Sequence, residues 1–470
     1  MTTTQRDPAP SFDPAELAGR RVLVYSLGIE GRDLARFMVS HGAAVTVSDT
    51  RTDDQLAAAA AVAPEGVAAL VTGQPLLDPA GFDLVAVSQS VLRSNPALLR
   101  ARELGIPTTS QMRLFLQLCR GRTIGITGSS GKSTTTALVG AMAAEADVRH
   151  IVGGNIGEAL LGRLDEIDEQ TTVILEISHT QLQYTDRSPH IAAITNITPN
   201  HLDQFSWDEY VGLKRNILAR QSREDAAVMN ADDHTSRALM AAVHGRLVRT
   251  SLAGEVQGDG AWLEGSRIVV REGTERSDAV RRDQVHLRGR HNLANVVMAC
   301  AIGHGAGFSA ASMASACTAF RGVPHRLEVV GSAGGVTWVN DSIATSPERT
   351  IAGLQAFTEP VVLLLGGREK NLPLDGLREL ARQRCRAIVC FGEAGRVFFD
   401  AVRTAVPAAT LVATLSEAVE AAARSSQPGD VVLLSPAGTS FDAYPNFEAR
   451  GEEFRRLAQD RPEFRPEVTS

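Results

Sequence analysis

A strand-like run at residues 123–127 leads into a short segment of small residues, a lysine and hydroxyl side chains. In order, this segment reads Gly128, Ser129, Ser130, Gly131, Lys132, Ser133 and Thr134. Glycines let backbone N–H groups converge on phosphate oxygens, and the start of the following helix adds partial positive charge. In such loops the lysine reaches the outer phosphates and the first hydroxyl holds Mg2+. The segment therefore predicts a binding site for a nucleoside triphosphate.

The spacing of this loop departs from the strict pattern GxxxxGK[ST], because the first glycine position falls on Ile126. What remains is the shorter form that runs from Gly128 to Ser133. A Gly/Ser-rich loop that merely opens an ordinary helix is the structural alternative. Lysine and serine in register after a strand favour the phosphate loop.

Polar residues also occur near the ends of other strand-like runs. Glu176 interrupts an apolar run, and His201 and Asp203 follow the run that ends at Ile197. Ligands of open α/β sheets bind at the carboxyl ends of the strands, so a carboxylate there is a candidate Mg2+ ligand. For Glu176 the alternative is an exposed edge position. For His201 it is a loop or core histidine, because imidazole is an uncommon ligand for a hard cation.

The N-terminal part of the chain predicts a βαβ opening. A strand at 21–27 is followed by a glycine-containing turn, a helix to about His41 and a second strand at 45–48. Ser26, Gly28 and Gly31 fall on the three glycine positions of a dinucleotide-binding turn, so the fingerprint is degenerate and a purely structural tight turn is the alternative. Asp49, Thr50 and Arg51 follow the second strand, where an acidic side chain could contact a ribose or uracil.

Strand and helix patterns then alternate along the chain. We expect strands at 82–88, 173–177, 191–197, 226–229, 336–340, 361–365, 387–391 and 431–434, helices at 112–119 and from His291 onward, and an irregular Gly-rich stretch at about 251–290. This order predicts an α/β fold of three domains in series. The domains are a Rossmann-like N-terminal domain (1–118), a central P-loop mononucleotide-binding domain (119–322) and a Rossmann-like C-terminal domain (323–470).

Composition limits the classes of protein. The 470 residues suit about three domains, and 44% are hydrophobic, enough for several cores. The net charge of −7 argues against a general nucleic-acid binder. No apolar run approaches the roughly 20 residues that span a bilayer, and the polar N-terminus is unlike a signal peptide, so we expect a cytoplasmic protein without membrane insertion. Five cysteines without a CxxC pair predict reduced thiols.

Taken in order, the motifs resemble those of the Mur ligases over nearly the whole chain. They are Gly128 to Ser133, Gly154-Asn155-Ile156-Gly157, Glu176, Asn196 to Asp203, Asn230-Ala231-Asp232-Asp233, His291-Asn292 with Asn295, and Pro324 to Glu328. Four further motifs resemble the branch of the family that adds glutamate: Asn340 to Thr345, Gly366-Gly367 with Lys370, Leu434 to Ala437, and Asn446-Phe447 with Glu453-Phe454.

The resemblance implies ATP-driven addition of D-glutamate to UDP-N-acetylmuramoyl-L-alanine through an acyl phosphate, in peptidoglycan synthesis. Lys132, Glu176, His201 and Lys214 would be catalytic. Ser133 and Glu176 would hold one Mg2+, and His201 would hold a second with a carbamate on Lys214. Unmodified, Lys214 is a surface or ion-pairing lysine. We expect a monomer whose partners are ATP, Mg2+ and these small substrates.

The resemblance also implies binding residues. ATP would contact Gly128, Ser129, Ser130, Gly131, Lys132, Ser133, Thr134, Asn292, Asn295, Arg326 and Asp341, with His325 as a nucleotide or interdomain contact. The UDP substrate would contact Gly28, Ile29, Glu30, Asp49, Thr50, Arg51, Asn155 and Gln181. Glutamate would contact Thr345, Lys370, Ser440 and Phe447, since cation and hydroxyl donors suit a dicarboxylate.

Three positions depart from the family pattern. Ile343 stands where a lysine is usual, Ser88-Gln89-Ser90 stands where Ser-Pro-Gly is usual, and Ser178-His179-Thr180-Gln181 adds a histidine near the expected metal site. These departures bear on amino-acid specificity more than on phosphoryl transfer. A related ligase for L-glutamate and a non-catalytic P-loop regulator remain alternatives. The Asp-Asn-Pro-Arg signature of ligases that add a diamino acid is absent from the sequence, which favours glutamate.

Overall fold

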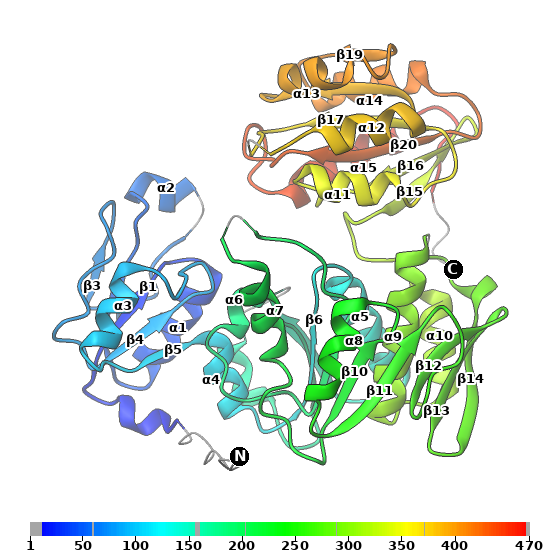
Figure 1. The fold of residues 1–470 in the computed structure, drawn as a ribbon. Helices are drawn as coiled ribbons and strands as arrows, with labels where there is room; N and C mark the ends of the chain where they lie inside the picture. Colours follow the sequence, from blue (N-terminus) through cyan, green and yellow to red (C-terminus); the bar gives the residue numbers. More distant parts are fainter. Residues whose placement is uncertain are drawn as a thin grey trace. The chain divides into compact units, whose positions relative to one another are not determined.

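The computed structural model describes residues 12–58, 61–155, 160–202, 204–287, 289–370 and 372–466. Two compact units make up the chain. The first comprises Met1–Val285 and Ala294–Thr318, and the second comprises His286–Leu293 and Ala319–Ser470. The strands form three sheets (Figure 1). Each sheet falls within one of the expected domains, whose boundaries at residues 118 and 322 stay a prediction. The expected series of three α/β sheets is confirmed.

The first sheet is parallel and has five strands, in the order β3-β2-β1-β4-β5. They are β3 (Ala69–Val71), β2 (Ala44–Ser48), β1 (Arg21–Tyr25), β4 (Leu84–Val87) and β5 (Thr108–Ser110). The helices of this part are η1 (Pro14–Leu17), α1 (Ile29–Ser40), α2 (Asp53–Ala58), α3 (Pro96–Glu103) and α4 (Gln111–Leu118). Side chains of α1 and α4 pack on one face of the sheet, and those of α3 pack on the other. The continuous apolar strands fit this burial on both faces.

The second sheet has nine strands, in the order β14-β13-β12-β11-β10-β9-β6-β8-β7. They are β6 (Arg122–Thr127), β7 (His150–Gly154), β8 (Thr172–Glu176), β9 (Ile191–Ile194), β10 (Ala226–Asn230), β11 (Arg246–Ser251), β12 (Gly260–Glu264), β13 (Arg267–Glu272) and β14 (Glu275–Arg281). Its helices are α5 (Lys132–Glu145), η2 (Leu161–Glu166), α6 (His179–Leu182), α7 (Trp207–Arg215), α8 (His234–Leu239), η3 (Met240–Ala242), η4 (Arg282–Gln284), α9 (Arg290–Ala306) and α10 (Ala310–Ala319). A single apolar core runs from α1 and α4 into η2 and this sheet, which joins the first two sheets in one unit.

The expectation of an irregular stretch at about 251–290 is wrong. This region contains β12, β13 and β14, which pair as antiparallel neighbours. Gly265 and Gly273 have φ values of 59° and 57° and lie in the two turns between these strands. Glycines at these positions allow the tight turns of hairpins. These glycines lie in turns between short strands, so a high glycine content does not indicate irregular structure in this region.

The third sheet has seven strands, in the order β19-β18-β17-β20-β16-β15-β21. They are β15 (Glu328–Ala333), β16 (Val336–Asn340), β17 (Val361–Gly366), β18 (Cys385–Phe391), β19 (Ala409–Leu411), β20 (Val431–Ala437) and β21 (Arg465–Pro466). Helices α14 (Leu415–Ser425) and α15 (Phe447–Gln459) cover one face. Helices α11 (Pro347–Leu354), α12 (Asp375–Arg384) and α13 (Gly395–Val402) cover the other. Both faces of the sheet are therefore buried.

Two further expectations can be compared with the structure. All five cysteines are free thiols, as expected. In the described part of the chain, no helix combines the length and apolar character needed to cross a bilayer.

Candidate active site

The glycine-rich loop connects β6 to α5 at the carboxyl end of β6, which lies between β8 and β9. Gly131 caps α5, so Lys132 is the first residue of the helix. The first turn of α5 contains no acidic residue, which leaves the positive end of the helix dipole uncompensated. Ser133 and Thr134 are buried in this turn. The loop therefore has the geometry and the charge of an anion site.

The segment after β9 holds the loop in place. Asn196 accepts hydrogen bonds from Ser129 N at its backbone oxygen (2.9 Å) and from Ser130 N at Oδ1 (3.1 Å). Thr195 Oγ1 donates to Ser130 O at 2.6 Å. Asn196 and Thr195 thus fix the backbone conformation of the loop before any ligand arrives.

Two glycines of the loop are required by close contacts. Gly131 has a φ of +82°, and a Cβ there would lie 2.2 Å from Asn295 Oδ1. Gly128 has a φ of +150°, and a Cβ there would lie 1.9 Å from Thr195 Oγ1. A side chain at either position would collide with these groups. Asn295, on α9, therefore approaches the loop, as its predicted ATP role requires.

Two lysines converge on the loop from different helices. Lys132 Nζ donates to Gly128 O at 3.0 Å, and Lys214 Nζ donates to the same oxygen at 2.9 Å and to Thr127 Oγ1 at 3.0 Å. Lys214 is only 1% exposed. Its burial, and then the charge of Lys132, lower its pKa well below the usual value, against the opposing charge of Glu176. The lysine is thus buried, and among the described residues it has no direct ion pair.

Glu176 ends β8 beside β6, paired in register with Ile126. It is 2% exposed, and its Oε1 accepts a hydrogen bond from Asn155 Nδ2 at 2.8 Å. Its Oε2 is buried and has no hydrogen-bond partner among the described residues. A buried carboxylate oxygen without a donor suits a cation, and with the hydroxyl of Ser133 the donors are oxygens, as Mg2+ prefers. The residues present therefore fit a magnesium ion.

His201 lies in the loop that leads to α7, with a φ of +54°. Its ring centroid is 4.3 Å from that of His179 and 6.2 Å from that of Tyr210. Burial, followed by the charges of Lys214, His201 and Lys132, lowers the pKa of His179 to about 3. The described residues contain no group of three His, Cys, Asp or Glu side chains able to hold a metal ion. Asp203 lies outside the described residues.

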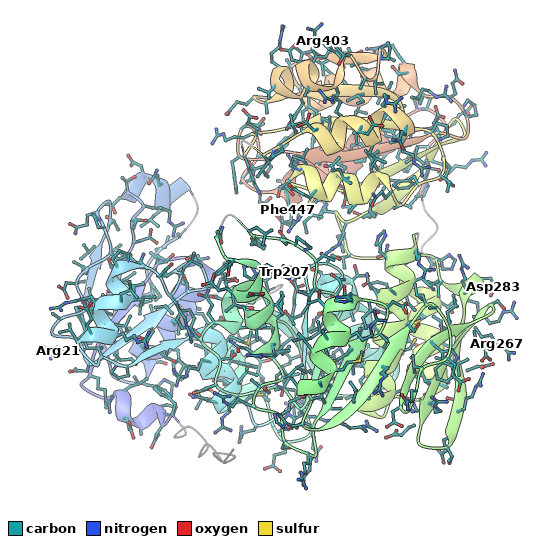
Figure 2. The ribbon with its side chains drawn as sticks, viewed as in Figure 1. Arg21, Trp207, Arg267, Asp283, Arg403 and Phe447 are labelled. Carbon is teal, nitrogen blue, oxygen red and sulfur yellow. The ribbon has the colours of Figure 1, made fainter. Side chains whose placement is uncertain are left out.

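Sequence reasoning missed Tyr210. Its hydroxyl lies 3.0 Å from Ser129 Oγ, and Lys214 Nζ lies 5.6 Å from the centre of its ring. Tyr210 also stacks on Trp207, at the first turn of α7 (Figure 2). The missed signal was its position four residues before Lys214, which places both on one side of a helix. Tyr210 thus links α7 to the phosphate loop.

The turn between β1 and α1 holds a buried carboxylate. Glu30 accepts hydrogen bonds from Gln89 N at Oε2 and from Gln181 Nε2 at Oε1, both at 2.6 Å. Burial raises its pKa, although these two hydrogen bonds act in the opposite direction. Gly31 packs against the strand, because a Cβ there would lie 1.7 Å from Ser26 O. Glu30 and Gln181 are brought together, but they bind each other.

Gly28, Ile29, Asp49, Thr50 and Arg51, also predicted for the UDP substrate, follow β1 and β2 of the same sheet, whereas Asn155 follows β7 of the second sheet and donates to Glu176. Asp49 accepts hydrogen bonds from Leu27 N (2.6 Å) and from Arg51 N, Nε and Nη2 (2.9, 3.0 and 2.7 Å). Burial alone would raise the pKa of Asp49, but these bonds outweigh it and lower the pKa to about 2. Thr50 and Ile29 are exposed, and Gly28 caps α1. The Asp49 and Arg51 pair, the hydroxyl of Thr50 and the apolar side chain of Ile29 thus follow β1 and β2 at the carboxyl ends of these strands.

In the second unit, two of the four predicted glutamate-binding residues are in direct contact. Lys370 Nζ donates to Thr345 Oγ1 at 3.3 Å. Ser342 Oγ donates to Phe447 O at 2.8 Å and accepts from Arg450 Nε at 3.0 Å, which ties the loop after β16 to the start of α15. Figure 2 labels Phe447 at this helix start. Ser440 is buried in the turn after β20.

Arg450 was not predicted from the sequence. It is fully buried, and it also donates to Ser342 O (2.8 Å) and Gly438 O (3.1 Å). Its burial lowers its pKa to about 10. Its only sequence signal is its position three residues after Phe447 on α15. Arg450 supports the loops that carry the glutamate candidates.

The predicted nucleotide contacts of this unit include a buried acid. Asp341 accepts hydrogen bonds from Ser435 Oγ (2.8 Å) and Leu327 N (3.2 Å). Burial raises its pKa to about 7, against the hydrogen bond from Ser435 and the charge of Arg326. His325 is buried and lies 3.0 Å from Asn340 Nδ2 through Nδ1. Asn292 lies on α9, one helical turn before Asn295.

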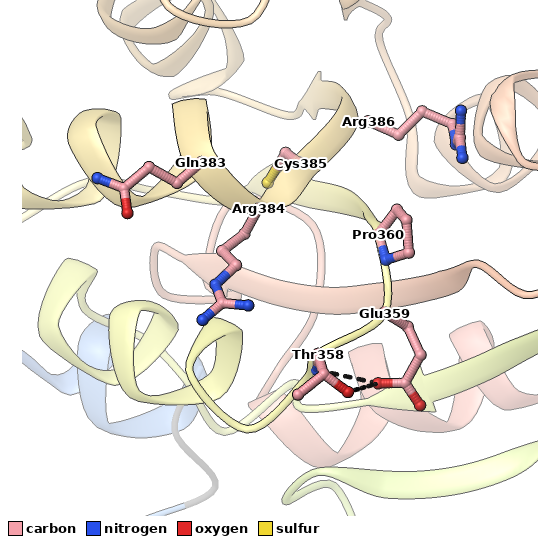
Figure 3. Close-up of a pocket in the computed structure, with 7 residues that line it drawn as sticks. All are labelled: Thr358, Glu359, Pro360, Gln383, Arg384, Cys385 and Arg386. Carbon is pink, nitrogen blue, oxygen red and sulfur yellow. Dashed lines mark hydrogen bonds between the residues drawn. The ribbon is translucent and has the colours of Figure 1, made fainter.

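A pocket of about 460 Å3 in the second unit lies elsewhere (Figure 3). It is lined by Thr358, Glu359, Pro360, Gln383, Arg384, Cys385 and Arg386. Pro360 precedes β17 and Cys385 begins β18, so the pocket lies at the amino ends of these strands. Thr345 and Lys370 follow the carboxyl ends of β16 and β17. The pocket is therefore separate from the candidate glutamate site.

Comparisons with known proteins identify the family and the fold. The model of the Mur ligase middle domain matches residues 126–303, and that of the Mur ligase glutamate ligase domain matches residues 325–438. The fold is similar to a solved UDP-N-acetylmuramate-alanine ligase from Thermotoga maritima (TM-score 0.57, 19% identity, 94% of this chain and 99% of that one). It is also similar to a pseudomurein peptide ligase type C from Methanothermus fervidus (TM-score 0.52, 16% identity, 93% of this chain and 100% of that one). The chain belongs to the Mur ligase family.

Within this family, relatives of higher identity have a more specific name. A UDP-N-acetylmuramoylalanine--D-glutamate ligase from Symbiobacterium thermophilum is 38% identical over 93% of this chain and 98% of that protein. A Clostridium botulinum protein of the same name is 37% identical over 93% of this chain and 96% of that protein. The similarity thus extends over all three sheets.

Proposed function

We propose that the protein is an ATP-dependent ligase that joins the amino group of D-glutamate to UDP-N-acetylmuramoyl-L-alanine in peptidoglycan synthesis. The similarity to D-glutamate ligases over 93% of the chain supports the substrates. The observation that carries the chemistry is the meeting of Lys132 and Lys214 at Gly128 O, next to the strand that presents Glu176. It combines a phosphate loop with a buried acid and a buried amine.

The reaction needs an activated carboxylate, because a carboxylate is a poor electrophile. The carboxylate of the substrate attacks the γ-phosphorus of ATP, ADP leaves, and an acyl phosphate forms. The amine of D-glutamate then attacks the acyl carbon, and inorganic phosphate leaves as the new amide loses a proton. Lys132 would bind the outer phosphates, while Gly128, Ser129, Ser130, Gly131 and Thr134 shape the loop around them.

Ser133 and Glu176 would hold one Mg2+, and His201 and a carbamylated Lys214 would hold a second. Bound Mg2+ would neutralise charge on the oxygens of the phosphoryl group in transfer. The buried oxygen of Glu176 without a partner supports the first assignment. The lowered pKa of Lys214 supports the second, because only a neutral amine adds to CO2 to give a carbamate.

We assign substrate binding to three domains, at 1–118 for the UDP substrate, 119–322 for ATP and 323–470 for glutamate. Gly28, Ile29, Glu30, Asp49, Thr50, Arg51, Asn155 and Gln181 would serve the UDP substrate; Asn292, Asn295, Arg326 and Asp341 would serve ATP; and Thr345, Lys370, Ser440 and Phe447 would serve glutamate. One chain carries every group, so the proposal needs only a monomer. ATP and UDP-linked sugars are nucleotides of the cytoplasm, so the reaction would take place there.

The deciding experiment measures phosphate release by the purified protein with ATP, Mg2+ and UDP-N-acetylmuramoyl-L-alanine. D-Glutamate, L-glutamate and no amino acid are compared, and mass spectrometry follows the UDP product. We expect release and a mass increase only with D-glutamate. Release only with L-glutamate would overturn the specificity, and release with no amino acid dependence would overturn the ligase.

A second experiment tests the carbamate. Lys214→Ala should be nearly inactive and should regain part of its turnover with short-chain carboxylic acids, which can replace the carbamate oxygens. Lys132→Ala is the matched control, because no carboxylic acid replaces its ammonium group. Full activity of Lys214→Ala would contradict the carbamate.

A further inference from the structure

His179 is a buried histidine beside His201 that the proposed mechanism does not use. It begins α6, directly after the capping residue Ser178, and it is 8% exposed. Its Nε2 is buried and has no hydrogen-bond partner among the described residues. A buried ring nitrogen without a partner is destabilising, so a ligand for it would remove that cost.

Among the residues that the structure describes, aromatic rings surround His179, and none of them supplies a hydrogen-bond partner for this nitrogen. Phe205 presents a ring at 5.5 Å in an edge-on arrangement, and the ring of Tyr210 lies at 5.4 Å. The hydroxyl of Tyr210 already lies 3.0 Å from Ser129 Oγ. The ring of His201 lies 4.3 Å from that of His179, at an interplanar angle of 33°. Two imidazoles thus lie together beside the buried amine of Lys214.

Two neighbouring imidazoles are a donor set for a divalent cation. Imidazole nitrogen binds Zn2+, for example, at about 2.0–2.1 Å, so the rings of two ligands on one ion lie several ångströms apart. The ring centroids of His179 and His201 are 4.3 Å apart. Nitrogen ligands favour ions such as Mn2+ over Mg2+, which prefers oxygen. A second histidine therefore changes which metal this position accepts.

We propose that His179 is an additional nitrogen ligand, next to His201, for the second divalent cation, and that it shifts the preference of this position from Mg2+ towards Mn2+. The inference rests on the proposed function only in taking His201 as a cation ligand. It makes His179, which is one of the departures from the family pattern, a determinant of metal specificity.

Pulsed electron paramagnetic resonance of bound Mn2+ tests this ligand directly. Mn2+ is added to the full chain with a non-hydrolysable ATP analogue, and the modulation from directly bound imidazole nitrogen is recorded. We expect two such nitrogens in the unmodified protein and one in His179→Phe, which keeps an aromatic ring. The cation at Ser133 and Glu176 has oxygen ligands and contributes no such signal.

Titrations with Mn2+ and Mg2+ give a second readout. His179→Phe should weaken the tighter Mn2+ site about tenfold and change Mg2+ binding less than about threefold. The matched control is His234→Asn, which removes an exposed imidazole on α8 and should leave both values unchanged. His179→Asn is the second variant in case the phenyl ring does not fit, and circular dichroism checks the fold of each.

The outcomes separate this inference from the proposed function. An unchanged nitrogen signal and an unchanged ratio of Mn2+ to Mg2+ affinity in both His179 variants would overturn the ligand role. Loss of one nitrogen would support it even if phosphate release proved independent of D-glutamate, a result that would overturn only the function.

Discussion

Two strand-turn-helix segments of the first unit differ in the charge that they place at the start of the helix. Between β6 and α5, the helix begins with Lys132 and its first turn has no acid. Between β1 and α1, the first turn contains the buried acid Glu30. Both segments end a parallel strand and both use glycine in the turn, so their backbones alone predict the same ligand.

The difference shows that the first helical turn decides what such a segment binds. A helix N-terminus attracts anions, and α5 leaves that attraction available for phosphate. In α1 the carboxylate of Glu30 occupies this position, and its two oxygens accept hydrogen bonds from Gln89 and Gln181. The carboxylate of Glu30 thus takes the place of a ligand anion at the start of α1, and its hydrogen bond from Gln181 links this segment to α6.

The strongest test of this comparison removes the cation from the phosphate loop. Lys132→Ala should lower D-glutamate-dependent phosphate release by about 10^2 to 10^3-fold, because a preorganised charge on the transferring phosphoryl group is lost. Thermal unfolding should change little, since Gly128 O keeps its bond from Lys214.

Lys370→Ala is the matched control for Lys132→Ala. Lys370 is exposed and contacts Thr345, so its loss should raise the KM for D-glutamate rather than weaken the binding of ATP. If both variants changed the KM for ATP equally, the phosphate loop would not be the specific ATP-binding segment that this comparison assumes.

A second test separates stability from function at Lys214. Lys214→Met should lower turnover about 100-fold, because a thioether cannot carry a carbamate. It should raise the free energy of unfolding by about 1 kcal/mol, since an apolar side chain replaces a buried amine without a carboxylate partner. Chemical denaturation and phosphate release measure the two effects.

Lys214→Arg provides the control for charge. Only three of the chain's 47 lysines and arginines are lysines, namely Lys132, Lys214 and Lys370. A guanidinium keeps the charge but stays protonated and forms no carbamate. Turnover retained by Lys214→Arg would show that charge alone is needed at this position.

The last test concerns the acid in the β1 segment, where an effect on stability and its pH dependence is expected. Glu30→Gln should change the free energy of unfolding by about 1–3 kcal/mol. One of the two hydrogen-bond donors, Gln89 N or Gln181 Nε2, would then face the NH2 group of the new amide instead of an accepting oxygen. The folded-state pKa of Glu30 is raised, so the folded protein binds the proton more tightly than the unfolded chain. The contribution of Glu30 to stability should therefore fall as the pH rises above the unfolded value of about 4.3.

Asp49→Asn is the control with the opposite sign. Its folded pKa of about 2 lies below the ordinary value of 3.8 expected in the unfolded chain, so the contribution of Asp49 is present above pH 3.8 and is lost as the pH falls towards 2. Denaturation curves of the unmodified protein and both variants at several pH values measure this. The same pH trend in both variants would contradict the assigned pKa directions.

Much of the fold was predictable because its signals are local. Apolar runs that end in glycine and polar residues marked β1, β6, β8 and β17, where burial on both faces demands continuous apolar sequence. The hairpins of β12 to β14 were missed, because their short strands are interrupted by turn glycines and charged residues. The phosphate loop was recognised because all of its parts lie within seven residues.

The arrangement around the loop was less predictable. The phosphate loop with Lys132 and the candidates Glu176 and Lys214 could be named from motifs, but the orphaned oxygen of Glu176 and the buried state of Lys214 could not. Tyr210 and Arg450 were missed because their partners, Ser129 and Ser342, lie far away in the sequence. Such contacts depend on how helices pack on sheets, which residue types alone do not specify.

By itself, the sequence determined most of the order of strands and helices outside the hairpins of β12 to β14, and the glycine-rich loop with its lysine and hydroxyl. These features depend on interactions between neighbouring residues. Only the tertiary structure decided that Glu30 binds Gln181, 151 residues away, and that His179 lies against His201 with an unpaired nitrogen. Burial and long-range pairing set the charge and the availability of these groups, and both arise only when distant segments pack together.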